Sequence, residues 1–302
     1  MIKQSESYLD KINNEFEEYY KNKTYPSVSP DLPKIIINTV KSNSVIEENK
    51  YILENYYNYL KILDSMDKQQ LKKYLNALKS TDAVNNQVLE KQDSFLISLL
   101  YQSERKHTID EILKTNKLTE DKLLKIHGML MEGTTSTDFD NYHYRKHNRN
   151  YVGTIDNNER NIHYLPLYNK YIEATMKGFF DYYNDKECNE SELFFKPFLI
   201  HLMIACLQVF EDGNTRLGRL LQNTKLYQQT NDLLNKKYDN PVLYLTNTYM
   251  PFRSQYRSLI KETAINPSND NINAWLSFNL GRLDEGVYKN SQMAEKVKLY
   301  VK

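Results

Sequence analysis

The sequence is poor in glycine and proline, with eight of each among 302 residues. Both residues interrupt helices, and strand-like alternation of polar and apolar residues is also nearly absent, so we predict an all-α chain. No apolar run approaches the roughly 18–20 residues that a membrane-spanning helix requires, and the polar first residues lack the apolar core of a signal peptide. We therefore expect a cytoplasmic protein that enters no membrane.

Charge of one sign is not in excess, because 40 Lys and Arg residues are balanced by 39 Asp and Glu residues. A balanced chain has no general attraction to nucleic acid, so we expect no nucleic-acid partner. The two cysteines form no CxxC pair, and the six histidines follow no zinc-ligand spacing. Any charged site must therefore be local.

A polar cluster interrupts a long helical pattern in the segment from Ile200 to Asn223. Apolar residues recur at three-and-four spacing on both sides of it, at Leu199, Ile200, Met203, Ile204 and Leu207 and again at Leu217, Leu220, Leu221 and Leu226. This spacing predicts one helix before the cluster and one after it, and the first of them should be buried on one side.

The residues between these two predicted helices have the features of an anion-binding loop. Gly213 and Asn214 allow positive φ angles, and the second helix begins there with the positive end of its dipole. Arg216 and Arg219 lie three residues apart on one helix face, where two guanidinium groups suit a polyphosphate. Asp212 at the mouth of the loop can hold Mg²⁺ against such phosphates.

The segment from Gln208 to Arg219 resembles the signature of the Fic domain, His-x-Phe-x-Asp/Glu-Gly-Asn-Gly-Arg-x-x-Arg. The matching residues are Phe210, Asp212, Gly213, Asn214, Arg216 and Arg219. Two positions differ, because Thr215 replaces the second glycine and Gln208 stands where the family has its catalytic histidine.

The resemblance implies a Fic-type helical bundle with a short β-hairpin flap and an N-terminal helical region. It also implies transfer of AMP from ATP, with Mg²⁺, to a Ser, Thr or Tyr hydroxyl of a target protein. In the family the histidine accepts the proton of that hydroxyl. A carboxamide cannot do so, and Gln208 should therefore lower the rate by roughly 10²–10⁴-fold.

The resemblance also assigns roles to single residues. Gln208, Asn214 and Arg219 take the catalytic positions, and Asp212 takes the metal position. Nucleotide binding is assigned to Gly213, Asn214, Thr215, Arg216, Gly218 and Arg219.

Residues 142–166 are the one hairpin-like segment of the sequence, with a turn at 156–158. They resemble the family's flap, which holds the target peptide by strand addition, and the flap residues are Tyr151, Val152, Gly153 and Tyr164. The alternative is a surface hairpin without a function.

The segment that ends at residues 102–105 resembles the family's inhibitory segment, Ser/Thr-x-x-x-Glu-Gly/Asn, of which only Glu104 is kept, because Leu100 replaces the Ser/Thr and Arg105 the Gly/Asn. The resemblance makes Glu104 a partner for Arg219. A solvent-facing glutamate at the end of a helix explains the same residue equally well.

A histidine elsewhere in the chain is the natural substitute for the missing base. His201 lies seven residues before Gln208, or about 10.5 Å along a helix, which favours a structural role for it. His127, in a predicted helix, has the same interpretation. His143, His147 and His163 surround the predicted flap, and one of them could replace the base, although their spacing does not require it.

The predicted organisation has an N-terminal helical region at 1–83, a Fic-like domain at 84–288 and a C-terminal helical tail at 289–302. The sequence is compatible with three functions: a weakened AMP transferase, a nucleotide-binding pseudoenzyme that holds a partner protein, and an engineered His-to-Gln, inactive form of an active AMP transferase. The target protein and a homo-oligomeric state are left open.

Overall fold

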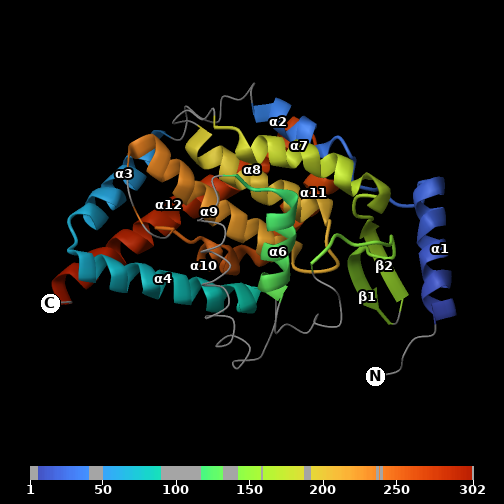
Figure 1. Ribbon diagram of the computed structural model, residues 1–302, viewed down its shortest axis with the longest axis horizontal. Helices are drawn as coiled ribbons and strands as arrows, with labels where there is room; N and C mark the ends of the chain where they lie inside the picture. Colours follow the sequence, from blue (N-terminus) through green and yellow to red (C-terminus); the bar gives the residue numbers. More distant parts are fainter. Residues whose placement is uncertain are drawn as a thin grey trace.

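The computed structural model describes residues 6–40, 50–89, 117–131, 142–157, 159–186, 192–235, 238 and 241–300. These residues are mostly helical, as predicted (Figure 1). The helices are α1 (Glu6–Asn22), α2 (Leu32–Val40), α3 (Lys50–Asp64), α4 (Lys68–Leu89), α6 (Glu120–Met131), α7 (Ile172–Asn184), α8 (Glu192–Leu207), α9 (Asn214–Leu234), α10 (Thr246–Tyr249), α11 (Arg253–Ile265) and α12 (Asn269–Tyr300). Short 3₁₀ helices, η2 (Asn169–Tyr171) and η3 (Met250–Phe252), precede α7 and α11.

Helix α8 is the centre of the hydrophobic core. Every residue from Phe198 to Leu207 has 0% of its surface exposed. The three-and-four spacing predicted burial on one side only, and this was wrong because α2, α7, α9, α11 and α12 all pack against α8. Between Phe198 and Leu207 the helix is apolar on all sides except at His201, which is typical of a helix at the centre of a domain.

The predicted hairpin is present, formed by the antiparallel strands β1 (Val152–Asp156) and β2 (Glu159–Tyr164). Its pairing is irregular at one place, because Gly153 is opposite Ile162 whereas Val152 is opposite Tyr164. His163 is therefore an extra residue in β2, in the manner of a β-bulge. A β-carbon at Gly153 would overlap the Asn161 carbonyl oxygen, so the irregular pairing requires glycine there.

The N-terminal segment packs on the hairpin (Figure 1). Phe16 of α1 forms a small apolar cluster with Ile162 and Leu165. The Leu165 N–H donates to the Pro26 carbonyl at 2.8 Å, and the Val28 N–H donates to the Leu165 carbonyl at 3.0 Å. The N-terminal region thus supports the base of the hairpin.

The predicted domain boundaries fall inside continuous helices. Residues 83 and 84 both belong to α4, and residues 288 and 289 both belong to α12. The divisions at these points stay predictions, and neither coincides with the end of a helix. No helix within the described residues is both long enough and apolar enough to span a membrane.

Candidate functional site

The signature loop turns at Gly213, whose φ of 79° lies in the left-handed region. A β-carbon at this position would overlap Met131 Sδ and would lie 3.3 Å from His127 Nε2. Glycine is therefore required both by the backbone conformation and by the close approach of α6. Helix α9 begins immediately afterwards at Asn214, which places the positive end of its dipole at the loop.

Asn214 holds the loop together from inside. Its Oδ1 accepts from the Phe210 N–H at 3.0 Å, and its Nδ2 donates to the Phe210 carbonyl at 2.9 Å. The same Nδ2 lies 3.1 Å from Gln208 Oε1. Because Asn214 is only 2% exposed, its side chain acts on the loop itself in this structure.

Gln208 follows α8 with a φ of 50°, which is unfavourable for a residue that has a side chain. Its Nε2 donates to the Ala205 carbonyl at 2.6 Å, while its Oε1 accepts from Asn214. Both ends of the carboxamide therefore have partners, which fixes its orientation. Such a group orients neighbours by hydrogen bonds and does not accept a proton near neutral pH.

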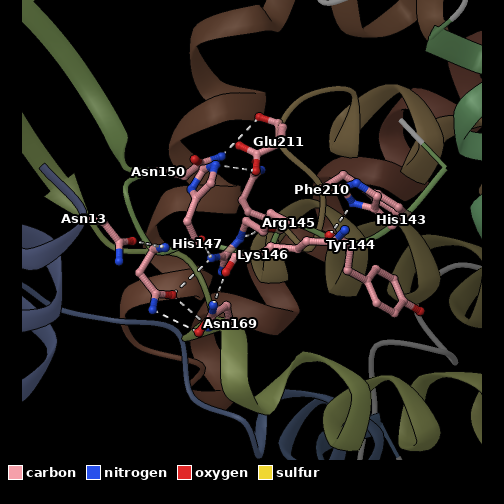
Figure 2. Close-up of polar contacts among 12 residues, drawn as sticks. Asn13, His143, Tyr144, Arg145, Lys146, His147, Asn150, Asn169, Phe210 and Glu211 are labelled. Carbon is pink, nitrogen blue, oxygen red and sulfur yellow. Dashed lines mark hydrogen bonds and ion pairs between the residues drawn. The ribbon is translucent and has the colours of Figure 1, made fainter. Parts of the chain in front are cut away.

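Residues 145–150, which precede β1, contact the signature loop through several hydrogen bonds, as Figure 2 shows. We call these contacts the Arg145 clasp. Arg145 donates from its backbone N–H to the Val209 carbonyl at 3.0 Å and from Nε to the Gln208 carbonyl at 2.8 Å. Its remaining guanidinium donors reach the His147 and Leu167 carbonyls. Burial lowers the pKa of Arg145, and the ring of carbonyl acceptors compensates for the lost hydration.

Two further contacts bind this segment to the loop (Figure 2). His147 Nε2 lies 2.7 Å from Glu211 Oε1, and Asn150 Nδ2 donates to the Glu211 carbonyl at 3.2 Å. No local sequence pattern links residues 145–150 to residues 208–211, and these partners were therefore not predicted.

His127 of α6 supports the loop from a different side. Its ring stacks on Phe210 with centroids 3.7 Å apart, and its Nε2 lies 2.8 Å from the Asp212 carbonyl. A carbonyl only accepts, so His127 Nε2 donates. The structural role predicted for His127 agrees with this contact, but its position beside the signature was not foreseen.

Asp212 and Arg216 form an ion pair at the start of α9. Asp212 Oδ2 lies 2.9 Å from Arg216 Nη2, and its Oδ1 accepts from the Gly213 N–H at 2.5 Å. The Asp212 side chain is 47% exposed, whereas that of Arg216 is 4% exposed. A carboxylate thus occupies part of the loop that was predicted to receive an anion.

Arg219 points into the protein and is 0% exposed. Its Nη1 donates to the Tyr256 hydroxyl at 3.1 Å, and that hydroxyl lies 2.9 Å from His201 Nε2. His201 Nδ1 in turn lies 2.7 Å from Gln222 Oε1. This network confirms the structural role predicted for His201.

A cleft of about 410 Å³ lies between the hairpin, the signature loop and α11. It is lined by Val152, Gly153, Thr154, His163, Tyr164, Gln208, Thr215, Ser254, Tyr256, Arg257, Ser258, Ile260 and Lys261. The structure thus brings the predicted flap residues Val152, Gly153 and Tyr164 together with Gln208 and Thr215 of the signature. The polar residues of α11 were missed because the sequence indicated only a closing helix there.

Several predicted site residues do not line the cleft. Tyr151 stacks on Phe16 at 6.0 Å and belongs to the cluster with α1. Gly218 faces α8, where a β-carbon would lie 2.6 Å from His201 Cδ2, so the packing of α9 on α8 requires glycine there. The residues that line the cleft also do not include Asp212, Gly213, Asn214, Arg216 and Arg219. Glu104 falls outside the described residues, and its pairing with Arg219 stays a prediction.

The fit of a magnesium ion depends on Asp212. Within the described residues, no group of three or more His, Cys, Asp or Glu side chains is placed to hold a metal. A half-exposed carboxylate at the start of α9 fits a cation that takes its other ligands from phosphate and water, which is how Mg²⁺ commonly binds.

Residues 117–226 match the sequence profile of the Fic/DOC family. A Fic-domain-containing signalling protein from Bacteroides thetaiotaomicron has a similar structure, with a TM-score of 0.62, 17% identity, and coverage of 81% of this chain and 97% of that one. Fic-1 from C. elegans gives a TM-score of 0.56 at 12% identity, over 83% of this chain and 74% of that one.

A Fic family protein from Desulfovibrio desulfuricans gives a TM-score of 0.53 at 16% identity, over 86% of this chain and 74% of that one. At such low identities the likeness establishes the fold. Comparison with curated proteins gives no significant match.

Proposed function

Because residues 117–226 form a domain of the Fic/DOC family, we propose that this protein transfers AMP from ATP to a Ser, Thr or Tyr hydroxyl of a target protein, at a rate reduced by Gln208. The observation that carries the proposal is the shared cleft. Gln208 and Thr215 of the signature line it together with Val152, Gly153 and Tyr164 of the hairpin. A hydroxyl presented by a peptide along the hairpin would thus meet the signature.

The phosphates of ATP would lie at the start of α9. The dipole of a 21-residue helix and the guanidinium group of Arg216 both favour negative charge there. Asp212, which pairs with Arg216 in this structure, is exposed enough to turn toward a magnesium ion. When bound, Mg²⁺ would neutralise charge on the phosphates.

Gln208 is the reason that the proposed transfer is slow. Its carboxamide is fixed between Ala205 and Asn214 and has no useful basicity. General-base catalysis contributes typically 10²–10⁴-fold, and this part of the rate is lost unless another group supplies it.

The second candidate is a nucleotide-binding pseudoenzyme that holds a partner protein through the hairpin. This alternative is favoured because the polar side chains of the loop already have partners within the protein. Gln208 and Asn214 make hydrogen bonds, and Asp212 makes an ion pair, without a substrate. Under this alternative ATP binds but no AMP is transferred.

Calorimetric titration with ATP, with and without Mg²⁺, tests the nucleotide site. We expect binding to the native protein and an affinity about tenfold lower or worse for Arg216→Ala, because charged hydrogen bonds to phosphate are lost. Arg160→Ala is the matched control, because Arg160 contacts Glu15 on α1 instead. Thermal unfolding of each variant shows that it is folded. Absence of heat at millimolar ATP and Mg²⁺ with the native protein contradicts the proposal.

A further inference from the structure

We propose that His163 of the hairpin is the general base of this protein and accepts the proton of the target hydroxyl in place of the histidine missing at position 208. The inference rests on the proposed AMP transfer. It starts from one juxtaposition: His163 and Gln208 line the same cleft, on the hairpin and on the signature loop respectively.

The irregular strand pairing directs His163 toward this cleft. Gly153 pairs with Ile162 and Val152 pairs with Tyr164, which leaves His163 as the extra residue of β2. An extra residue of this kind re-aims its side chain, and such bulges are frequent beside active sites. Ile162 and Tyr164 on either side are 9% and 1% exposed, so the strand is anchored around a half-buried imidazole.

The other histidines that the structure describes are already engaged. His127 donates to the Asp212 carbonyl, and His201 is enclosed by Gln222 and Tyr256. His143 contacts the Tyr144 carbonyl, and His147 pairs with Glu211. Within the described part of the chain, His163 makes no hydrogen bond or ion pair that would hold its ring nitrogens, so its imidazole is available to a substrate.

No other side chain in the lining of the cleft is suited to accept a proton near neutral pH. Arg257 and Lys261 are cations that already carry their protons. Tyr164 must lose a proton before it can accept one, and burial raises its pKa well above the ordinary value. The lining holds no carboxylate. Imidazole is the side chain that exchanges protons in this range.

The proposed step conserves atoms and charge. The target hydroxyl oxygen attacks the α-phosphorus of ATP while its proton passes to a ring nitrogen of His163. The bond between the α-phosphorus and the bridging oxygen to the β-phosphate breaks, and pyrophosphate leaves with that electron pair. The products are the AMP ester of the target and an imidazolium that returns its proton to water.

The test measures labelling of protein by α-³²P-ATP at saturating ATP. We expect His163→Ala to lower kcat by about 10²-fold or more, because general-base catalysis contributes that much, and to leave the KM for ATP unchanged. Added imidazole should restore part of the activity of this variant. His143→Ala is the matched control and should label as the native protein does, because His143 is not among the residues that line the cleft.

A second pair of variants separates catalysis from support of the hairpin. In the Gln208→His background a base is supplied at position 208, so adding His163→Ala should change kcat by less than about threefold. If His163→Ala lowered kcat equally in both backgrounds, His163 would have a structural role and the proposal would be overturned. The proposal would also be overturned if the His163→Ala variant labelled protein at the rate of the native protein.

The same measurements distinguish the two proposals. If His163→Ala labels as fast as the native protein, His163 is not the base and the proposed function stands. If the native protein binds ATP without labelling while Gln208→His labels, the native protein is the nucleotide-binding pseudoenzyme and both proposals fail. If neither protein binds ATP, the proposed function itself is contradicted.

Discussion

Gln208 Nε2 donates to the Ala205 carbonyl at 2.6 Å, so the carboxamide of Gln208 closes the end of α8. In Gln208→Glu a carboxylate oxygen would face the Ala205 carbonyl oxygen, and two acceptors cannot form a hydrogen bond. We expect Gln208→Glu to lower the free energy of unfolding by about 1 kcal/mol, because the half-buried hydrogen bond to Ala205 is lost. Urea denaturation measures this loss. Gln255→Glu, on the exposed surface of α11, should stay within about 0.5 kcal/mol of the native protein.

Gly213 in the signature loop and Gly281 in α12 allow the effect of a glycine-to-alanine substitution on stability to be compared between a loop and a helix. Gly213→Ala must adopt a φ of 79° and overlap Met131, and we expect it to lose about 2–4 kcal/mol of stability. Gly281→Ala has nothing within 4 Å of the new β-carbon and lies in the exposed part of α12. It should stabilise the protein by about 0.4–1 kcal/mol. Equal effects of both substitutions on the urea midpoint contradict this account of the loop.

Arg145 is expected to be more important than its distance from the signature in the sequence suggests. Its guanidinium reaches the Gln208, His147 and Leu167 carbonyls, which a single ammonium group cannot do together. We predict that Arg145→Lys loses about 2–4 kcal/mol of stability, as several buried acceptors become unsatisfied. Arg149→Lys, four residues away and half-buried, is the control. If urea denaturation gives the two variants the same free energy of unfolding, the hydrogen bonds of the Arg145 clasp are not needed to hold the signature loop.

Glu104 gives a prediction that the sequence alone supports. If Glu104 contacts Arg219, then Glu104→Gly frees that guanidinium and should tighten ATP binding or raise the transfer rate. Calorimetry measures the affinity, with Glu54→Gly on α3 as a control for loss of one acidic side chain. An unchanged affinity and an unchanged rate would favour a glutamate that faces solvent.

Local patterns predicted the elements that depend on neighbours in the sequence. The turn at Gly213, the helix from Asn214 and a hairpin within residues 142–166 were all expected from residue types and spacing. Contacts between distant segments could not be predicted in this way. The Arg145 clasp joins residues 63 positions apart, and the donation from His127 to Asp212 joins residues 85 apart.

In the candidate site, too, the features that depend on local sequence were predicted and those that depend on contacts between distant segments were not. Gln208 and Thr215 were recognised from the signature, yet nothing in the sequence marks the register irregularity that places His163 in the cleft. Gly218 was assigned to the nucleotide from its place in the signature, whereas its contact with His201 depends on how α8 and α9 pack.

The most direct test of the account is labelling of protein by α-³²P-ATP in the Gln208→His variant, compared with the native protein and with the Gln208→His variant that also carries Asp212→Ala. The native protein is proposed to lack the base at position 208, for which His163 is a less efficient substitute, so the histidine variant should label protein faster than the native protein, by up to about 10²-fold. The added Asp212→Ala should abolish that gain. A histidine variant that binds ATP and labels no faster than the native protein would contradict the claim that this is an AMP transferase slowed by Gln208.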